Sequence, residues 1–497
     1  MKVFIFAIGG TGARVLRSLT MLLASGIQLN PDVEFIPIII DMDATNGDTV
    51  RTKNVINKYT SIRKKAYSEN VSDGFFSPKL KNLASYKADN FKGLIQDTFQ
   101  LEFGNVDKTF FKYIGADQLN YENECLLESL FDNSPEPANT DEASPTELHL
   151  NLGKGFKGNP NIGSIVFNDL VNTNEYKYFE DICTEKDKVF VISSIFGGTG
   201  SSGFPQLVKN IRKSDKNAVK NVHIGALVVM PYFLIARKSK SSIDSNNFNS
   251  KTKAALSYYA SELDGVVNDT YYIGNNETGD AYDNHEGAEK QKNMAHLIEM
   301  ISAISIINFV KNAPPTIQDG NLDFKRYGFH YYEFGVTKES SSYDFRYFFP
   351  KTQNDIFLPL TKLFYFAKYY TEDLKKSDSM KAAFAKSLGL YENLLISDQF
   401  YDELTSFLKD DFLGWIKELN RNKPQFSAFN LTEDYRKMIT GQEYPVKLSQ
   451  IIEGMSKFEK KFGSISSTRE RFMRIIYETI NEIVREKVKT LPSGASM

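Results

Sequence analysis

The sequence predicts an α/β protein, in which a mostly parallel sheet has helices on both faces, followed by a mainly helical C-terminal domain. Two observations support this. Over the first 335 residues, short apolar or β-branched runs alternate with segments of helical periodicity, which is the pattern of strand–helix–strand units. After about residue 340, strand-like runs become rare and long amphipathic helical stretches follow one another.

Five strands are expected, and each is a short apolar run of the kind that is buried on both faces of a parallel sheet. They are Val3–Ile8, Phe35–Ile40, Val189–Ile192, Val222–Met230 and Thr270–Ile273. The helices expected between or after them are Ala13–Ala24, Gly163–Leu170, Phe204–Ile211, Lys253–Val266 and Glu289–Phe309.

One region interrupts this alternation. Residues from about 46 to 150 are polar and weakly helical, and they end in the acidic, Pro- and Ser-rich run FDNSPEPANTDEASPTE. Such a composition is typical of a solvated or disordered loop. We therefore expect an α/β domain over residues 1–339 with an insertion at about 46–150, and a helical domain over 340–497.

Composition excludes several classes of partner. The 60 basic and 62 acidic residues give a net charge of −2, so no overall field favours nucleic acid or a membrane surface. No apolar run reaches the ~18 residues that cross a bilayer. The two cysteines, Cys125 and Cys183, form neither a metal-binding spacing nor a disulfide framework. The opening MKVFIFAIGGTG is too short and too interrupted by glycine for a signal peptide. We expect a cytoplasmic protein.

Glycine-rich loops lead into three of the expected helices, and two of these loops directly follow an expected strand. The three loops are IGGTGAR at Ile8–Arg14, GKGFKGNPNIGS at 153–164 and GGTGSSG at 197–203. Glycines allow tight turns, and the N–H groups at a helix N-terminus can form a cradle for a phosphate. The lysine of the common phosphate loop is absent, and Val15 breaks the dinucleotide fingerprint GxGxxG. A purely structural tight turn stays open as the other explanation.

A further polar turn, DMDATN, follows the second strand. Asp41 and Asp43 lie there at a carboxyl end of the expected sheet, the edge at which ligands of open α/β sheets bind. An Asx turn that ends the strand explains the same residues equally well.

Together these motifs resemble the tubulin/FtsZ superfamily. FGGTGSSGFP is similar to its GGGTGTG signature, although Phe196 replaces the first glycine. GKGFKGNPNIG resembles the GxGAGxNPxxG loop of the FtsZ branch, DMDAT the NTDAQ-type turn, and VHIGALVVMPYF the VVTKPF strand. The resemblance covers about residues 1–335 without the insertion. The insertion and the helical tail are similar to the divergent prokaryotic tubulin-like group.

The resemblance implies a GTP or GDP site with Mg²⁺, in which backbone N–H groups hold the phosphates without a lysine. The implied phosphate residues are Gly9, Gly10, Thr11, Gly12, Asn159, Gly197, Gly198, Thr199, Gly200, Ser201, Ser202 and Gly203. Thr199 and Ser201 would add hydroxyl donors, and Asp41 or Asp43 would orient the ion through water.

The base side follows from the same resemblance. Asn293, expected on the helix Glu289–Phe309, would read the guanine edge, since an amide carbonyl can accept from guanine N–H groups. Asn275 resembles a second base-side Asn. Arg14 stands where FtsZ-like sequences have an Asn, which leaves the choice between guanine and adenine open.

The sequence departs most from the tubulin/FtsZ pattern in the loop that would hydrolyse GTP. QDGNLDFKRYGF resembles the NxDxxD/E-type catalytic loop at Asn321 and Asp323, but the second carboxylate position is Arg326. Arginine cannot accept a hydrogen bond from the attacking water. Either this short match is accidental, or the protein hydrolyses GTP slowly or not at all, with Asp323 and Arg326 as the candidate residues.

The favoured function is therefore a GTP-binding, cytoskeletal-type protein that associates head to tail into filaments. The alternative is a nucleotide-binding scaffold that does not polymerise and binds a protein partner through its C-terminal helices or its insertion. A Rossmann-type NAD(P) enzyme would fit IGGTGAR but would leave the other two glycine loops without a role.

Overall fold

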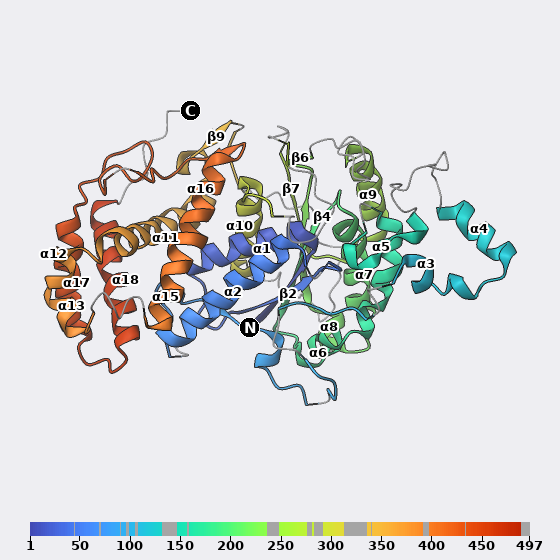
Figure 1. Ribbon diagram of the computed structural model, residues 1–497, viewed down its shortest axis with the longest axis horizontal. Helices are drawn as coiled ribbons and strands as arrows, with labels where there is room; N and C mark the ends of the chain where they lie inside the picture. Colours follow the sequence, from blue (N-terminus) through green and yellow to red (C-terminus); the bar gives the residue numbers. More distant parts are fainter. Residues whose placement is uncertain are drawn as a thin grey trace, which may run out of the picture.

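The computed structural model describes residues 1–43, 45–68, 71–89, 91–95, 99–104, 108–131, 147–156, 159–235, 248–275, 281–282, 292–312, 335–338, 340–390, 397–432 and 434–488. In these residues an α/β unit and a set of C-terminal helices lie side by side along the long axis of the molecule (Figure 1).

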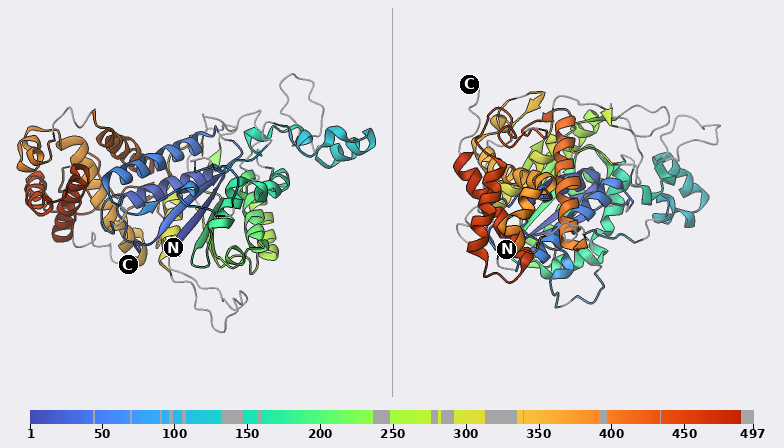
Figure 2. Two further views of the ribbon diagram at one scale, coloured as in Figure 1. Left: turned by 90° about the horizontal axis from the view of Figure 1, so that it is seen from below. Right: turned by 60° about the vertical axis from the view of Figure 1, so that its left-hand side comes forward.

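Six parallel strands form the central sheet in the order β3–β2–β1–β4–β5–β7 (Figures 1 and 2). All five predicted strands are present; the sixth, β3, has only two residues, too few to give a pattern in the sequence. The strands are β1 Lys2–Ile8, β2 Glu34–Ile40, β3 Lys79–Leu80, β4 Lys188–Ser194, β5 His223–Val229 and β7 Asp269–Ile273. Ala7 of β1 lies between Ile39 of β2 and Ile192 of β4, so the carboxyl ends of these strands meet at one edge.

Helices cover both faces of this sheet, as predicted (Figure 2). One face carries α1 Gly9–Ala24, α2 Gly47–Ala66 and α10 Leu297–Lys311. The other carries α5 Pro160–Val166, α6 Asn174–Ile182, α7 Gly198–Lys213, α8 Asn217–Lys220 and α9 Phe248–Glu262. A separate short pair, β6 Leu234–Ile235 and β8 Ala281–Tyr282, lies outside the main sheet.

Two helices are almost completely buried: α10, which is largely apolar on all sides, and α1, whose buried residues include Arg14 and Arg17. Every residue of α1 except Gly10 is buried, and every residue of α10 except Lys311. The expected start of α10 at Glu289 is not what the structure shows, because residues 292–296 are not helical. The helix begins at Leu297, where the His296 ring accepts from the N–H of Ile298 and Glu299 completes a capping box.

Part of the expected insertion belongs to the α/β core. Asn46 caps α2, which packs along α1, and the N–H of Leu101 donates to the carbonyl of Ile39 at the edge of the sheet. The apolar periodicity of α2 is weak in the sequence because its buried side includes the polar residues Asp48, Thr49 and Thr52. Farther along, α3 Phe110–Tyr113 and α4 Tyr121–Phe131 project from the body (Figure 1, right).

The C-terminal region is helical, as predicted. Its helices are α11 Pro350–Lys368, α12 Ser377–Lys381, α13 Ala383–Ser387, α15 Gln399–Ser406, α16 Leu413–Arg421, α17 Leu448–Phe462 and α18 Thr468–Lys487. The strand pair β9 Ser342–Tyr343 and β10 Gln425–Phe426 is short. No helix in the described part of the chain is long and apolar enough to span a membrane.

These helices share one hydrophobic core with the α/β unit. Trp415 is fully buried and donates from its indole nitrogen to Ser18 Oγ on α1, at 3.2 Å. The Phe75 ring stacks on Phe366 of α11 with a centroid separation of 4.8 Å. Side chains of the two predicted domains, 1–339 and 340–497, therefore pack against each other. The boundary between them stays a prediction.

Candidate functional site

Two glycine-rich helix N-termini lie side by side at the carboxyl edge of the sheet. Strand β1 leads directly into α1 at Gly9, and the neighbouring β4 leads through Gly197 into α7 at Gly198. A Cβ placed on Gly9 would lie 3.4 Å from Thr199 Cβ and 3.9 Å from the backbone nitrogen of Gly200. The first N–H groups of a helix have no partner within the helix. Here those of α1 and α7 lie next to each other, and such an arrangement can bind an anion.

The glycines of the two loops serve different purposes. Gly9 has a φ of +69°, which a side chain would strain. A Cβ on Gly12 would lie 2.7 Å from the carbonyl carbon of Ala7, and one on Gly200 would lie 2.7 Å from both backbone N and O of Ser194. Gly12 and Gly200 therefore let each helix sit tightly on its own strand. At Gly10 the nearest atoms would be 3.7 Å away, so this position has room.

The hydroxyl groups expected to bind phosphate are engaged within their own helix. Ser201 Oγ donates to the carbonyl of Gly197 at 2.5 Å, and Ser202 Oγ donates to the carbonyl of Gly198 at 2.6 Å. Thr199 is half-buried beside Gly9. Gly203 packs on the ring of Phe167, where a Cβ would approach to 2.7 Å.

Phe196 stands where the signature has its first glycine. It is buried, and its ring packs on those of Tyr232 and Phe233, with centroid separations of 6.3 and 5.5 Å. Asn159 is half-buried and begins α5, which packs on α7.

Asp41 and Asp43 lie together at the carboxyl end of β2 and make local turns. The N–H of Asp43 donates to Asp41 Oδ1 at 3.2 Å, and Thr49 Oγ1 donates to Asp41 Oδ2 at 3.1 Å. Asp43 Oδ1 accepts from the backbone and the hydroxyl of Thr45, at 3.0 and 2.7 Å. Burial raises the pKa of Asp41 to about 7.

These two carboxylates do not form a direct metal cage. In the described part of the chain, no three His, Cys, Asp or Glu side chains come together as a metal site. A magnesium ion retains much of its hydration and can be held through water. The fit of Asp41 and Asp43 to Mg²⁺ is therefore limited to contacts with its water molecules.

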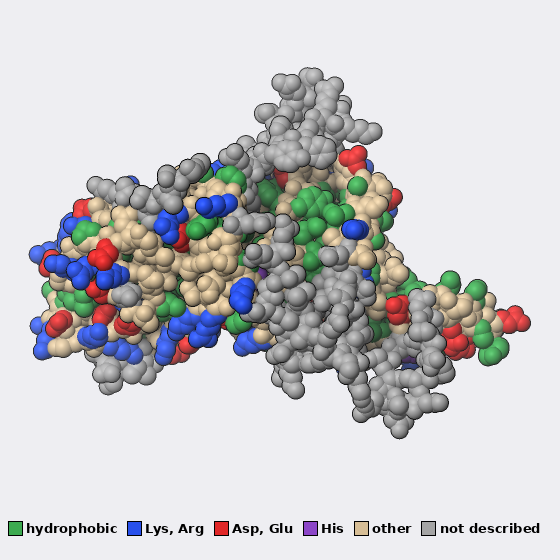
Figure 3. Space-filling model, turned by 90° about the horizontal axis from the view of Figure 1, so that it is seen from above, with side chains coloured by type: hydrophobic (Ala, Val, Ile, Leu, Met, Phe, Trp, Pro, Cys, Tyr) green, Lys and Arg blue, Asp and Glu red, His purple; other side chains and the backbone are tan. Residues whose placement is uncertain are grey.

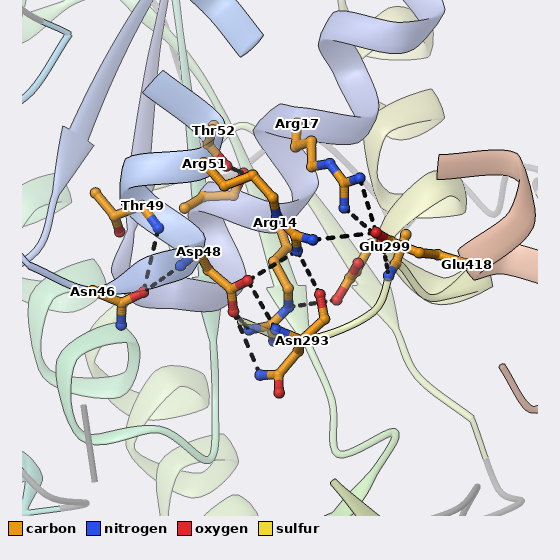
Figure 4. A network of polar contacts seen from close by, with 12 residues as sticks. Arg14, Arg17, Asn46, Asp48, Thr49, Arg51, Thr52, Asn293, Glu299 and Glu418 are labelled. Atoms are coloured by element: carbon orange, nitrogen blue, oxygen red, sulfur yellow. Dashed lines mark hydrogen bonds and ion pairs between the residues drawn. The ribbon is translucent and has the colours of Figure 1, made fainter. Parts of the chain in front are cut away.

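Arg14 is the centre of a buried polar network that connects three helices (Figure 4). Its Nη1 lies 2.8 Å from Asp48 Oδ2 in the first turn of α2, and its Nε lies 2.6 Å from Glu299 Oε1 in the first turn of α10. Its Nη2 donates to Tyr232 Oη at 2.9 Å and to Thr11 Oγ1 at 3.3 Å.

Burial alone would lower the pKa of Arg14, but the neighbouring Tyr232, Glu299 and Asp48 raise it well above its usual range. The guanidinium stays charged, and its donors are turned toward protein groups. This arrangement favours a positioning role for Arg14 over direct reading of a base.

A second layer of ion pairs extends the network to the C-terminal helices. Arg51 lies 3.0 Å from Asp48 Oδ1 and 3.2 Å from Glu418 Oε1, so it bridges α2 and α16. Glu418 also accepts from Arg17 at 2.7 Å and from the backbone of Ala295 at 2.7 Å.

Asn293 lies four residues before α10, not on it, and is fixed by Asp48. Its backbone N–H donates to Asp48 Oδ1 at 3.1 Å, and its Nδ2 donates to Asp48 Oδ2 at 3.4 Å. Its backbone carbonyl accepts from Arg51. Figure 4 shows its side-chain oxygen pointing away from the network. An amide carbonyl held in this way can accept hydrogen bonds from a ligand.

Not every predicted residue joins this group. Asn275 is half-buried and follows β7, two strands away from β4 at the same edge of the sheet. Asp323 and Arg326 fall outside the residues that the structure describes.

Several residues of the site were not found from the sequence. They are Asp48, Arg51, Tyr232, Glu299 and Glu418. Asn46 followed by Asp48 is a helix start signal, a capping residue and then an acidic first turn, and could have located the beginning of α2. Glu418 has no local signal, because its partners lie hundreds of positions away.

Comparison with known proteins finds a similarity over one part of the chain. Residues 168–291 match a family model described as "Tubulin like". This segment contains β4, the glycine loop at 197–203, α7 and β5. A search of curated proteins finds no match. Among solved structures, CetZ from Methanosaeta thermophila strain DSM 6194 is similar, with 12% identity and a TM-score of 0.26, over 65% of this chain and 57% of that chain. This chain therefore spans less than two thirds of that protein.

Proposed function

We propose that this tubulin-like protein binds a guanine nucleotide, GTP or GDP with Mg²⁺, at the carboxyl edge of its sheet. The observation that supports the proposal best is the meeting of two glycine-rich helix N-termini, α1 and α7, with Gly9 beside Thr199. Two sets of N–H groups can share a polyphosphate that carries several negative charges, which is why no lysine is needed.

The phosphates would lie over Gly9, Gly10 and the turn at 197–199, where main-chain N–H groups open and Gly10 leaves room. Thr11, Asn159 and Ser201 would line the surroundings. Magnesium, when bound, would offset phosphate charge, and Asp41 and Asp43 would orient its water molecules.

The base would lie toward Asn293, with Asn275 as a second amide. Asp48 holds the Asn293 amide nitrogen, so the side-chain oxygen is the end that a base would meet. That oxygen can accept hydrogen bonds from guanine N1–H and N2–H. Adenine does not present this pair of neighbouring donors. Arg14 supports this arrangement by fixing Asp48.

The first experiment is to identify what the purified protein carries and prefers. Nucleotide released from the protein by denaturation would be identified by ultraviolet absorbance and chromatography. Calorimetry would then compare GTP, GDP, ATP and NADPH on nucleotide-free protein. We expect binding of GTP and GDP and much weaker binding of ATP. Equal affinity for ATP would overturn the guanine assignment, and binding of NADPH alone would overturn the proposal as a whole.

We further propose that the nucleotide-bound protein is of the prokaryotic cytoskeletal type, acts in the cytoplasm and associates head to tail, with slow or absent GTP hydrolysis. Light scattering with GTP and with GDP tests the association. The alternative, a scaffold that does not polymerise, has one observation in its favour, since α4 projects from the body as a partner-binding segment would (Figure 1). Binding without any change in scattering would support that alternative.

A further inference from the structure

One helix, α4 (Tyr121–Phe131), lies apart from the body with its apolar side chains in solvent. None of its residues is buried, and Tyr121, Leu126 and Leu130 expose 79%, 61% and 66% of their surface. The helix is nevertheless attached, because the Phe131 ring packs on Phe110 at 5.3 Å between centroids. A folded helix that presents large apolar side chains at such exposure is typical of a surface that meets a partner.

The charge of this helix, called here the acidic arm, is entirely negative. Glu122, Glu124 and Glu128 lie on it without any lysine or arginine. No ion pair joins these carboxylates to a cation among the described residues. The red and green side chains of the arm form the right-hand end of the molecule in Figure 3.

At the opposite end of the molecule, two segments carry an excess of lysine. The segments 375–387 and 448–462, which include α12, α13 and α17, carry seven lysines and three carboxylates. The lysines that are exposed and have no carboxylate partner among the described residues are Lys375, Lys381, Lys386, Lys460 and Lys461. They define the lysine tip, which forms the left-hand end in Figures 1 and 3. Phe462, on the same surface, is half-buried.

We propose that the acidic arm of one copy docks on the lysine tip of a second copy. The uncompensated charges of the two surfaces are opposite in sign, and the exposed apolar side chains of the arm can pack beside the half-buried Phe462 of the tip. Since arm and tip lie at opposite ends of the long axis, this contact is heterologous and continues from copy to copy as an open chain.

This contact goes beyond the proposed nucleotide binding and uses no residue of the phosphate loops. An arm of this length offers less than the ~800 Å² per partner of a stable interface, so the contact between a single pair is weak. Charges at a surface are screened within about 8 Å at physiological salt, so the association weakens as salt is raised.

The test is sedimentation velocity on the full chain without nucleotide, up to about 100 µM protein, at low and at physiological salt. The arm variant carries Glu122→Lys, Glu124→Lys and Glu128→Lys. The tip variant carries Lys381→Glu, Lys460→Glu and Lys461→Glu. The control carries Lys177→Glu, Lys213→Glu and Lys220→Glu, which reverses three exposed lysines on α6, α7 and α8.

We expect the wild-type chain and the control to self-associate, and the arm and tip variants each to associate at least tenfold more weakly. An equimolar mixture of the arm and tip variants should regain association, because each reversed surface then meets a reversed counterpart. Replacing Leu126 and Leu130 by Ser should weaken association without any change in its salt dependence.

A wild-type chain that stays monomeric, variants that associate as the wild type does, or a mixture that regains nothing would each overturn the proposal. Calorimetry with GTP on the same variants keeps the two proposals separate. The arm and tip lie far from the phosphate loops, so loss of association with intact GTP binding is the expected pattern, and a chain that binds no GTP can still be tested for this contact.

Discussion

The Arg17 guanidinium holds the Glu418 carboxylate with two hydrogen bonds, of 2.7 Å from Nη1 to Oε2 and 3.3 Å from Nη2 to Oε1, although 401 positions separate the two residues. The first helix of the sheet domain is thereby fixed to α16. Burial acts to raise the pKa of Glu418, but Arg17 and Arg51 outweigh it and the pKa is lowered. Glu418 is thus ionised at neutral pH and connects both arginines to the backbone of Ala295.

Replacing Glu418 should destabilise the fold. Glu418→Ala leaves the buried charge of Arg17 and the partly buried charge of Arg51 without a shared partner, and we expect a loss of about 3 kcal/mol in the free energy of unfolding. Denaturation in urea measures it. Lys457→Ala removes the exposed pair with Glu482 and is the matched control, expected to cost less than ~1 kcal/mol. Equal losses in the two variants would contradict the role given to Glu418.

The two glycine loops should respond differently to a methyl group. Gly200→Ala forces a Cβ against the backbone of Ser194, so we expect destabilisation of about 1–3 kcal/mol. Gly10→Val places a Cβ at an ordinary contact distance of 3.7 Å from Arg14 and Asn46, beside the space proposed for phosphate. Its unfolding free energy should change little, while affinity for GTP falls at least tenfold by calorimetry. If a folded Gly10→Val variant binds GTP with unchanged affinity, the phosphates do not bind at this loop.

Asp41 should make stability depend on pH. Its pKa is raised to about 7 by burial, whereas an unfolded aspartate titrates near ~3.9. Between these values the folded state binds the proton and the unfolded state does not, so stability falls as pH rises from about 4 to 7. Relative to Asp41→Asn, the wild type should lose up to roughly 4 kcal/mol over this interval and no more above it. A constant difference between the two proteins from pH 4 to 7 would argue against the shift.

Base choice depends on Asn293 in the proposed site. Asn293→Ala removes the amide oxygen that would accept from guanine, and we expect GTP binding to weaken by about 1–3 kcal/mol while the weaker ATP binding stays the same. Asn221→Ala, an exposed asparagine at the end of α8, is the control and should change neither. If GTP and ATP weaken equally, Asn293 supports the site without reading the base.

Hydrolysis provides a separate test of the loop that contains Asp323. We expect wild-type turnover well below the ~1 s⁻¹ at the low end of ordinary enzyme rates, because Arg326 cannot orient water as an acceptor. Arg326→Glu supplies a carboxylate and should raise the rate of phosphate release under conditions of assembly. Brisk hydrolysis by the wild type, or no response in the variant, would show that this loop is not the catalytic one.

Much of the sheet could be predicted because β1, β2, β4 and β5 are buried on both faces and are therefore unbroken apolar runs in the sequence. The start of α10 could not, since the polar residues upstream of Leu297, Glu289 to Lys292, are themselves good helix formers and the capping residue, His296, is an unusual one. The glycine loops were located correctly, but the sequence cannot tell a glycine required by packing, such as Gly200, from one that leaves space, such as Gly10.

The ion-pair network could not be predicted from sequence patterns. Arg14 and Glu299 are 285 positions apart, and no spacing rule connects residues that meet only after the sheet, α10 and the C-terminal helices have packed. The sequence did indicate that Arg14 is unusual, because FtsZ-like sequences have an Asn at this position. The structure gives the physical reason, since a charge at this buried position requires the carboxylates that surround it.

The burial of α1 has a consequence for how the protein is made. The ribosome completes this helix well before it reaches the residues that cover it, because Trp415 and Glu418 lie 397 and 401 positions after their partners Ser18 and Arg17. Contacts this distant in sequence slow folding, and the waiting segment is prone to aggregate. Residues 1–339 produced alone would leave uncovered the part of α1 that packs on Trp415 and Glu418, so we expect this fragment to aggregate more readily than the full chain.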